Sequence, residues 1–87
     1  MKGYEFQRIR NDLELTQDEL AQVLGFSGKH AVSNIETEFR KPSALVAALM
    51  LLLDELPVPK AQSLVRRLKE LQLMAKKTQK RSHGKGT

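Results

Sequence analysis

Five polar side chains recur at helical spacing between Ser27 and Thr37, and together they could hydrogen-bond to the edges of nucleic-acid bases. At about 100° per residue they share the helix face opposite Ala31, Val32 and Ile35. Lys pairs well with guanine and Asn with adenine in the major groove of DNA. We therefore predict base contacts from this face; the alternative is an ordinary solvated helix surface. The five residues are Lys29, His30, Ser33, Asn34 and Thr37.

Three further residues flank this helix and could contact phosphates. Gly28, near the predicted helix start, allows the backbone to approach an anion, which the helix dipole favours. Arg40 and Lys41 follow in a predicted loop, where they could flank a phosphate backbone. Simple loop solubility explains this basic pair equally well.

The segment before this helix predicts a second, shorter helix that would hold it in place. Thr16 and Glu19 form a capping box, and Leu15 can pack against Leu20 as a hydrophobic staple. Gly25 follows the apolar repeat where a left-handed residue ends a helix. We expect the next helix to start at an N-cap formed by Ser27. Two helices joined by such a turn form a helix-turn-helix, whose second helix fits the major groove.

Two more helices are predicted around this pair. The first spans 3–12, with Phe6, Ile9 and Leu13 toward the core and Tyr4 beside them. The other is opened by Pro42 and Ser43 and ends near residue 55. Its apolar residues cover more than one core-facing stripe, which predicts burial or a partner. Phe39 is expected to anchor the loop between 37 and 41 in the core.

A C-terminal helix over 57–77 is predicted after a Pro-containing break, followed by a basic disordered tail over 78–87. Its apolar stripe consists of Ala61, Leu64, Leu68, Leu71 and Ala75; Val65 widens the stripe, and Leu73 and Met74 lie off it. Packing within the chain and contact with a second subunit explain the stripe equally well. We take as dimer candidates Leu64, Leu68, Leu71 and Leu73.

Several of these residues occur in the order found in one protein family. The chain resembles the repressor/Cro-type (XRE-like) helix-turn-helix domains over roughly residues 4–56. The residues that carry the resemblance are Leu15-Thr16-Gln17, Glu19-Leu20-Ala21, Leu24-Gly25, Phe26-Ser27, Val32-Ser33, Ile35-Glu36 and Pro42-Ser43.

The resemblance implies an all-α fold, a compact bundle of about five helices, with a DNA-binding domain over 1–56. It also implies that Gln17 contacts phosphate and that Arg10 and Glu36 form a buried structural ion pair. Two positions depart from the family pattern. One extra residue lies between Ser27 and Val32, and Glu38 stands where the family commonly has Gly. The helix is therefore expected to run longer, or the loop over 37–41 to close differently.

Charge is distributed unevenly along the 87 residues. Residues 1–56 hold six Lys and Arg against nine Asp and Glu, whereas residues 57–87 hold nine against one. A basic C-terminal third is suited to neutralising phosphates, and the alternative is a solvated helix face with a disordered tail. There is no Cys, which fits a reducing cytoplasm, and no apolar run approaches the roughly 20 residues that span a membrane.

Catalysis finds no support in the sequence. His30 and His83 lie far apart, and the adjacent acids at 18–19 and 54–55 would diverge by about 100° on helices. We expect no catalytic residue, no metal site and no cofactor.

The sequence thus predicts a transcriptional regulator of the repressor kind: a homodimer that binds an inverted repeat in double-stranded DNA. It would be cytoplasmic, and nucleoid-associated when bound. The alternative is an antitoxin-like or adaptor module whose main partner is another protein, such as a toxin. General single-strand or RNA binding is disfavoured, because all four aromatic residues are expected in the core.

Overall fold

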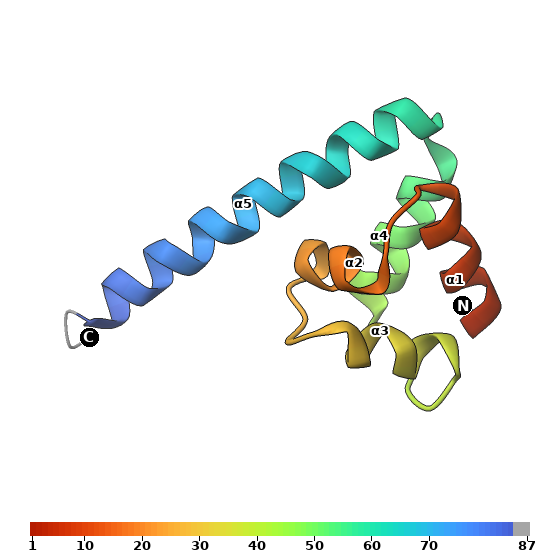
Figure 1. Cartoon of the computed structure of the whole chain (residues 1–87), viewed down its shortest axis with the longest axis horizontal. Helices are drawn as coiled ribbons and strands as arrows, with labels where there is room; N and C mark the ends of the chain where they lie inside the picture. Colours follow the sequence, from red (N-terminus) through yellow and green to blue (C-terminus); the bar gives the residue numbers. More distant parts are fainter. Residues whose placement is uncertain (85–87) are drawn as a thin grey trace.

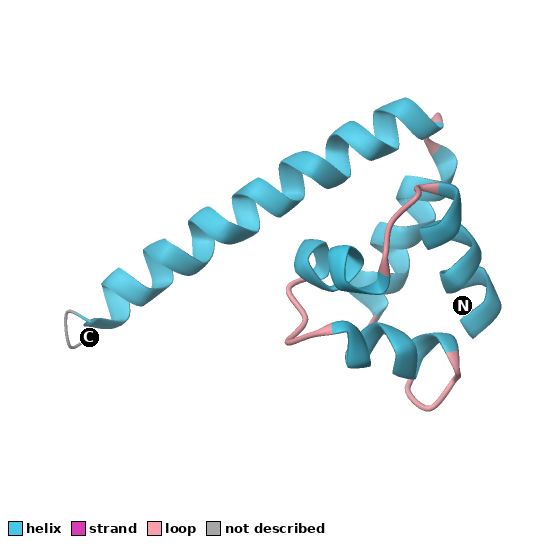
Figure 2. Cartoon of the chain, viewed as in Figure 1, coloured by secondary structure: helices cyan, strands magenta, loops and turns pink. Residues whose placement is uncertain are grey.

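The computed structural model describes the backbone of residues 1–84 and the side chains of residues 1–76, and this part of the chain is helical apart from short loops. Figure 2 shows these helices and loops, with no strand in the described residues. In Figure 1 the first four helices pack together, and the fifth runs along one side of this group and extends beyond it. The helices are α1 (Gly3–Asp12), α2 (Gln17–Leu24), α3 (Lys29–Glu36), α4 (Ala44–Glu55) and α5 (Val58–Gly84).

Local signals in the sequence determine where α2 begins and ends. The Thr16 hydroxyl accepts the backbone N–H of Glu19 at 3.1 Å, and the Glu19 carboxylate accepts that of Thr16 at 2.8 Å. Gly25 then ends the helix with a left-handed backbone, φ 76°. The predicted capping box and glycine stop are both confirmed.

The start of α3 differs from the prediction. Its N-cap is Gly28, in an extended conformation, and no side chain caps the helix. The Ser27 N-cap is therefore wrong by one residue, because the turn after Gly25 uses one residue more before the chain becomes helical. The helix ends at Glu36 and does not run longer.

One core joins all five helices. Phe6, Ile9 and Leu13 are buried from the α1 side, as predicted. The α2–α3 pair contributes five buried apolar side chains, and α4 contributes Met50 and Leu53. The core is completed from α5 by two side chains, those of Ala61 and Val65. Part of α5 is therefore as much a member of the core as the first four helices.

The loop after α3 closes through Glu38, which occupies the left-handed region itself at φ 65°. Its carboxylate accepts the backbone N–H of Gly3 at 2.9 Å, and its own N–H donates to Ile35. The hydrogen bond to the start of α1 offsets the energetic cost of this conformation in a non-glycine residue. Neither alternative expected from the missing glycine holds: α3 ends at Glu36, and Glu38 itself adopts the left-handed conformation that a glycine would take.

Two aromatic predictions are wrong. Phe39 is 77% exposed, because the bonds on either side of it hold the loop away from the core. Tyr4 is 69% exposed, because it lies about 200° from Phe6 around α1. The premise that every aromatic residue lies in the core therefore fails.

The packed stripe of α5 is also shifted from the predicted one. Ala61, Val65 and Leu68 face the core, whereas Leu64 and Leu71 are exposed. Ala61 is fully buried, and its small side chain lets α5 approach the core closely there. Two glutamine amides hold it further: the Gln62 amide donates to the Leu13 carbonyl and the Gln72 amide to the Val23 carbonyl, each at 3.2 Å.

The C-terminal end of α5 extends to Gly84, past the predicted end near residue 77. The added residues include Lys, Gln and Arg, which favour helix, and no Gly or Pro lies between positions 60 and 83. The rest of the predicted tail, 85–87, lies outside the described residues. None of the helices described is both long and apolar enough to cross a lipid bilayer.

Candidate nucleic-acid interface

The outer face of α3 carries four of the five predicted base-contacting residues, and the fifth, Thr37, is its C-cap. Lys29, His30 and Thr37 are exposed, whereas Ser33 and Asn34 are partly buried. On the opposite face, Val32 and Ile35 anchor the helix in the core. The helix therefore presents polar groups outward over its whole length.

The five are not equally free. The Thr37 hydroxyl lies within hydrogen-bond distance of the Ser33 and Asn34 carbonyls, at 2.9 and 3.4 Å. As the donor in these contacts, it retains its capacity to accept a hydrogen bond. Within the described part of the chain, no side-chain hydrogen bond ties down Lys29 or His30, so Lys29 keeps its donors and His30 keeps both ring nitrogens for a ligand.

A hollow of about 370 Å³ brings α3 together with the loop that follows it. Its walls include His30 and Asn34 from α3 and Arg40 and Lys41 from the loop. The backbone N–H of Arg40 donates to the Asn34 carbonyl at 3.0 Å, which fixes the loop against the helix. Residues predicted separately as base and phosphate contacts are thus neighbours. Sequence reasoning missed two other polar members of the wall, Ser27 and Ser43.

A buried ion pair supports α3 from behind. The Arg10 guanidinium donates to both Glu36 oxygens, at 2.6 and 3.3 Å, and to the Leu15 carbonyl at 2.8 Å. The two side chains are only 11% and 5% exposed. The ion pair implied by the resemblance is therefore present, and it joins α1, the α1–α2 turn and α3.

Gln17 belongs to the same network. Its amide donates to the Glu36 carboxylate at 2.9 Å. The side chain predicted to contact phosphate is therefore held by α3 in the unbound protein. Its amide oxygen accepts no bond from the described residues, and the residue remains partly exposed. Gly28 has open space around its Cα: a Cβ placed there would meet no atom within 4 Å.

Electrostatics favour the charged form of Glu19 at the start of α2. Hydrogen bonds from the Thr16 backbone and side chain lower the pKa of this carboxyl, and Lys69 adds to the effect. Where α1 meets α4, the Arg8 guanidinium donates two hydrogen bonds to the Asp54 carboxylate, and these bonds lower the pKa of that carboxyl.

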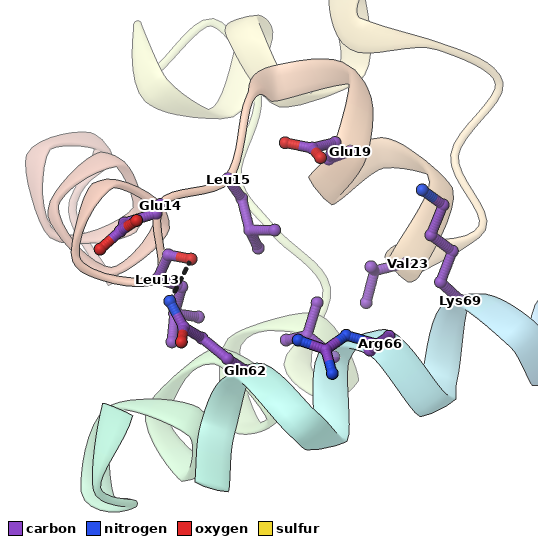
Figure 3. A pocket seen from close by; sticks show the side chains of 9 residues that line it. Leu13, Glu14, Leu15, Glu19, Val23, Gln62, Arg66 and Lys69 are labelled. Atoms are coloured by element: carbon purple, nitrogen blue, oxygen red, sulfur yellow. Dashed lines mark hydrogen bonds between the residues drawn. The ribbon is translucent and has the colours of Figure 1, made fainter. Parts of the chain in front are cut away.

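Another hollow, of about 310 Å³, separates the α1–α2 turn from α5 (Figure 3). Figure 3 shows the bond from Gln62 to Leu13 at one end and Lys69 on the α5 wall at the other. Its apolar lining consists of Leu13, Leu15, Val23 and Val65, and Arg66 projects from α5 beside them. None of the residues predicted to contact DNA lines this hollow.

The dimer candidates separate into two groups. Leu68 packs against the core, whereas Leu64, Leu71 and Leu73 are exposed. Leu64 lines a shallow, mostly apolar hollow with Leu56 at the junction of α4 and α5. On α4, Leu45 and Leu52 are exposed as well.

Among the described residues, no three His, Cys, Asp or Glu side chains gather as a metal site would require. Comparison with known proteins gives no match to a family model, a curated protein or a solved structure.

Proposed function

We propose that the chain is a sequence-specific regulator that binds double-stranded DNA through α3, as a helix-turn-helix protein of the repressor/Cro type. The observation that carries this proposal is the shared hollow of His30, Asn34, Arg40 and Lys41. Base-reading and phosphate-binding groups must lie side by side if one docking event is to position the protein and read sequence. The neighbouring acid, Glu38, is already bound to the start of α1.

In this function, α3 would enter the major groove with Lys29, His30, Ser33, Asn34 and Thr37 toward the bases. Gln17, Gly28, Arg40 and Lys41 would hold the phosphates. The Arg10–Glu36 pair supports the arrangement because it ties α3 rigidly to α1. A rigid support limits the entropy lost when the helix docks.

A homodimer would place two α3 helices in successive major grooves, about 34–36 Å apart, and read an inverted repeat. The apolar side chains available for such an interface are the exposed Leu45 and Leu52 of α4 and the hollow of Leu56 and Leu64 at the α4–α5 junction; we call them together the α4–α5 apolar surface. Leu52→Asp should lower the mass measured by analytical ultracentrifugation toward that of the monomer. Tyr4→Asp, which introduces the same charge at an exposed position on α1, is the control and should leave the mass unchanged.

The decisive experiment is selection from a random duplex library at about 150 mM salt, with the full-length protein. Enrichment of an inverted repeat is expected. Retention of all sequences alike, and only at low salt, would refute sequence-specific recognition, because phosphate contacts alone do not distinguish bases.

Single substitutions then test whether the base contacts come from α3. Asn34→Ala should relax the preference at one base pair in each half-site and weaken binding by roughly 1–3 kcal/mol. The same change at the exposed Asn11 on α1 is the control and should leave both properties unchanged. An equal effect of the two substitutions would contradict the proposed reading face.

The second candidate is a protein-interaction module of the antitoxin or adaptor kind. The α4–α5 apolar surface favours it, because exposed apolar patches of this kind mark protein interfaces. A second protein that copurifies stoichiometrically, and is absent from preparations of Leu52→Asp, would support this candidate. Self-association alone does not, since the regulator also requires it.

A further inference from the structure

Phe39 is an apolar side chain that the fold places in solvent. At 77% exposure it is among the most exposed large hydrophobic residues, although the sequence predicts it in the core. An aromatic ring left in water forgoes the stabilisation that its burial in the core would give. The position of this ring therefore calls for a structural explanation.

The exposure does not come from a loosely attached loop. On one side, Glu38 is fixed by its carboxylate bond to Gly3 and its backbone bond to Ile35. On the other, the backbone N–H of Arg40 is fixed to the Asn34 carbonyl. Both neighbours of Phe39 are thus held, and the ring is presented by a closed turn whose ends are anchored to α1 and α3.

Phe39 adjoins, along the chain, the basic residues of the hollow beside α3, although it does not line that hollow itself; the acid before it, Glu38, is bound to Gly3. Arg40 and Lys41 follow it directly and line the hollow that contains His30 and Asn34. Two cations beside an exposed apolar ring suit a ligand that carries negative charge and an apolar group close together. DNA meets this description where a thymine methyl group lies in the major groove beside the backbone.

We propose that Phe39 contacts the C5 methyl group of a thymine at the edge of the site read by α3, and so adds base preference there. The inference rests on the proposed DNA-binding function and names a further residue for it. Phe cannot hydrogen-bond to a base edge, and thymine methyl is the apolar group that the major groove displays. Arg40 and Lys41 would hold the adjacent phosphates.

The test replaces each thymine of the selected site in turn with deoxyuridine, which lacks only the methyl group. At one position in each half-site, the wild-type protein should bind about three- to fivefold more weakly, as expected for one buried methyl group. Phe39→Ala should bind the thymine and deoxyuridine duplexes equally. Its affinity for both should match that of the wild type for the deoxyuridine duplex or fall below it.

Two controls separate this contact from other effects. Tyr4→Ala removes another exposed aromatic ring and should retain the full response to deoxyuridine. Phe39→Ala should leave the salt dependence of binding unchanged, whereas Lys41→Gln should reduce its slope. The thermal unfolding midpoint of Phe39→Ala should equal that of the wild type, because the ring is outside the core.

Three results would overturn the inference. One is the absence of any position where the wild-type and Phe39→Ala proteins differ in their response to deoxyuridine. A second is weaker self-association of Phe39→Ala, which would place the ring in a protein interface. A third is a larger effect of Phe39→Ala on single-stranded than on duplex DNA, which would indicate stacking on an unpaired base. Failure of the library selection is a separate outcome, because it refutes the proposed function before this test begins.

Discussion

At the scale of single residues, the support of α3 depends on a charge pair that is nearly out of water. Arg10 and Glu36 form hydrogen bonds to each other. Arg10 also donates to the Leu15 carbonyl, and Glu36 also accepts from the Gln17 amide. Such a pair costs much to desolvate, so its importance appears when one partner is removed. The remaining charge would then be buried without compensation.

We therefore expect Glu36→Gln to lower the free energy of unfolding by about 3–5 kcal/mol in urea denaturation. The double variant Arg10→Leu/Glu36→Leu should recover much of that stability, because it leaves no isolated charge. Arg67→Ala breaks an exposed ion pair and serves as the control. A decrease of less than about 1 kcal/mol for Glu36→Gln would show that the pair is solvated in solution.

Gly3 is required by a close approach of two backbones. A Cβ at this position would collide with the carbonyl oxygen of Glu36. Gly3→Ala should destabilise the protein by roughly 1–3 kcal/mol, because α1 and α3 would have to move apart. Gly28→Ala meets no atom within 4 Å, so its cost in thermal unfolding should be that of a poorer N-cap alone, about 1 kcal/mol or less.

At the scale of helices, the sequence predicts the features that depend on residues close together in the chain. The limits of α2 follow from Thr16, Glu19 and Gly25, and the start of α4 follows from Ser43, whose hydroxyl accepts the N–H of Val46. Each signal acts within four residues. The exposure of Phe39 depends instead on the hydrogen bond that the Glu38 carboxylate accepts from the backbone N–H of Gly3, 35 positions away. No local pattern in the sequence reveals this bond.

The candidate site likewise combines features that follow from local sequence with features that depend on the tertiary structure. Helical periodicity places His30 and Asn34 on one face, which needs no knowledge of the tertiary structure. Their meeting with Arg40 and Lys41 in one hollow depends on how the loop closes. The Gln17–Glu36 bond likewise requires α2 and α3 to be docked, so neither feature could be predicted from spacing.

The capping box should make stability depend on pH. Because its bonds lower the pKa of Glu19, their contribution is fully present above the ordinary pKa of about 4.3 and is lost as pH falls through the lowered value. Unfolding measured over the acidic range below neutral pH should show this decline, and Glu19→Gln should flatten it. Thr16→Ala should cost about 0.5–2 kcal/mol at neutral pH. An unchanged pH profile in Glu19→Gln would contradict the assignment.

At the scale of the whole molecule, opposite charges occupy different parts of the chain. Residues 1–56 are acidic in balance, and the residues after Ala75 include five Lys and Arg and no acid. A protein that approaches DNA with an acidic body benefits from a basic extension, which raises the rate of encounter. The extension would add affinity without adding base preference.

Deleting the residues after Ala75 should therefore weaken binding to all DNA sequences. The slope of log affinity against log salt should fall by roughly 0.9 for each phosphate that the shortened protein no longer neutralises. Fluorescence anisotropy between about 50 and 200 mM salt would measure both affinity and slope. The enriched sequence motif should stay the same, and an unchanged slope would exclude a role for the extension.

The two glutamine contacts of α5 have a consequence for hydrogen exchange. Between Gln62 and Gln72 the helix is held to the Leu13 and Val23 carbonyls and to the core, so its amide protons exchange only when the whole protein opens. Beyond Gln72, residues 73–76 are exposed and lie outside the core, so this part of the helix can open locally. One continuous helix should therefore show two rates of amide exchange, with the change near Gln72.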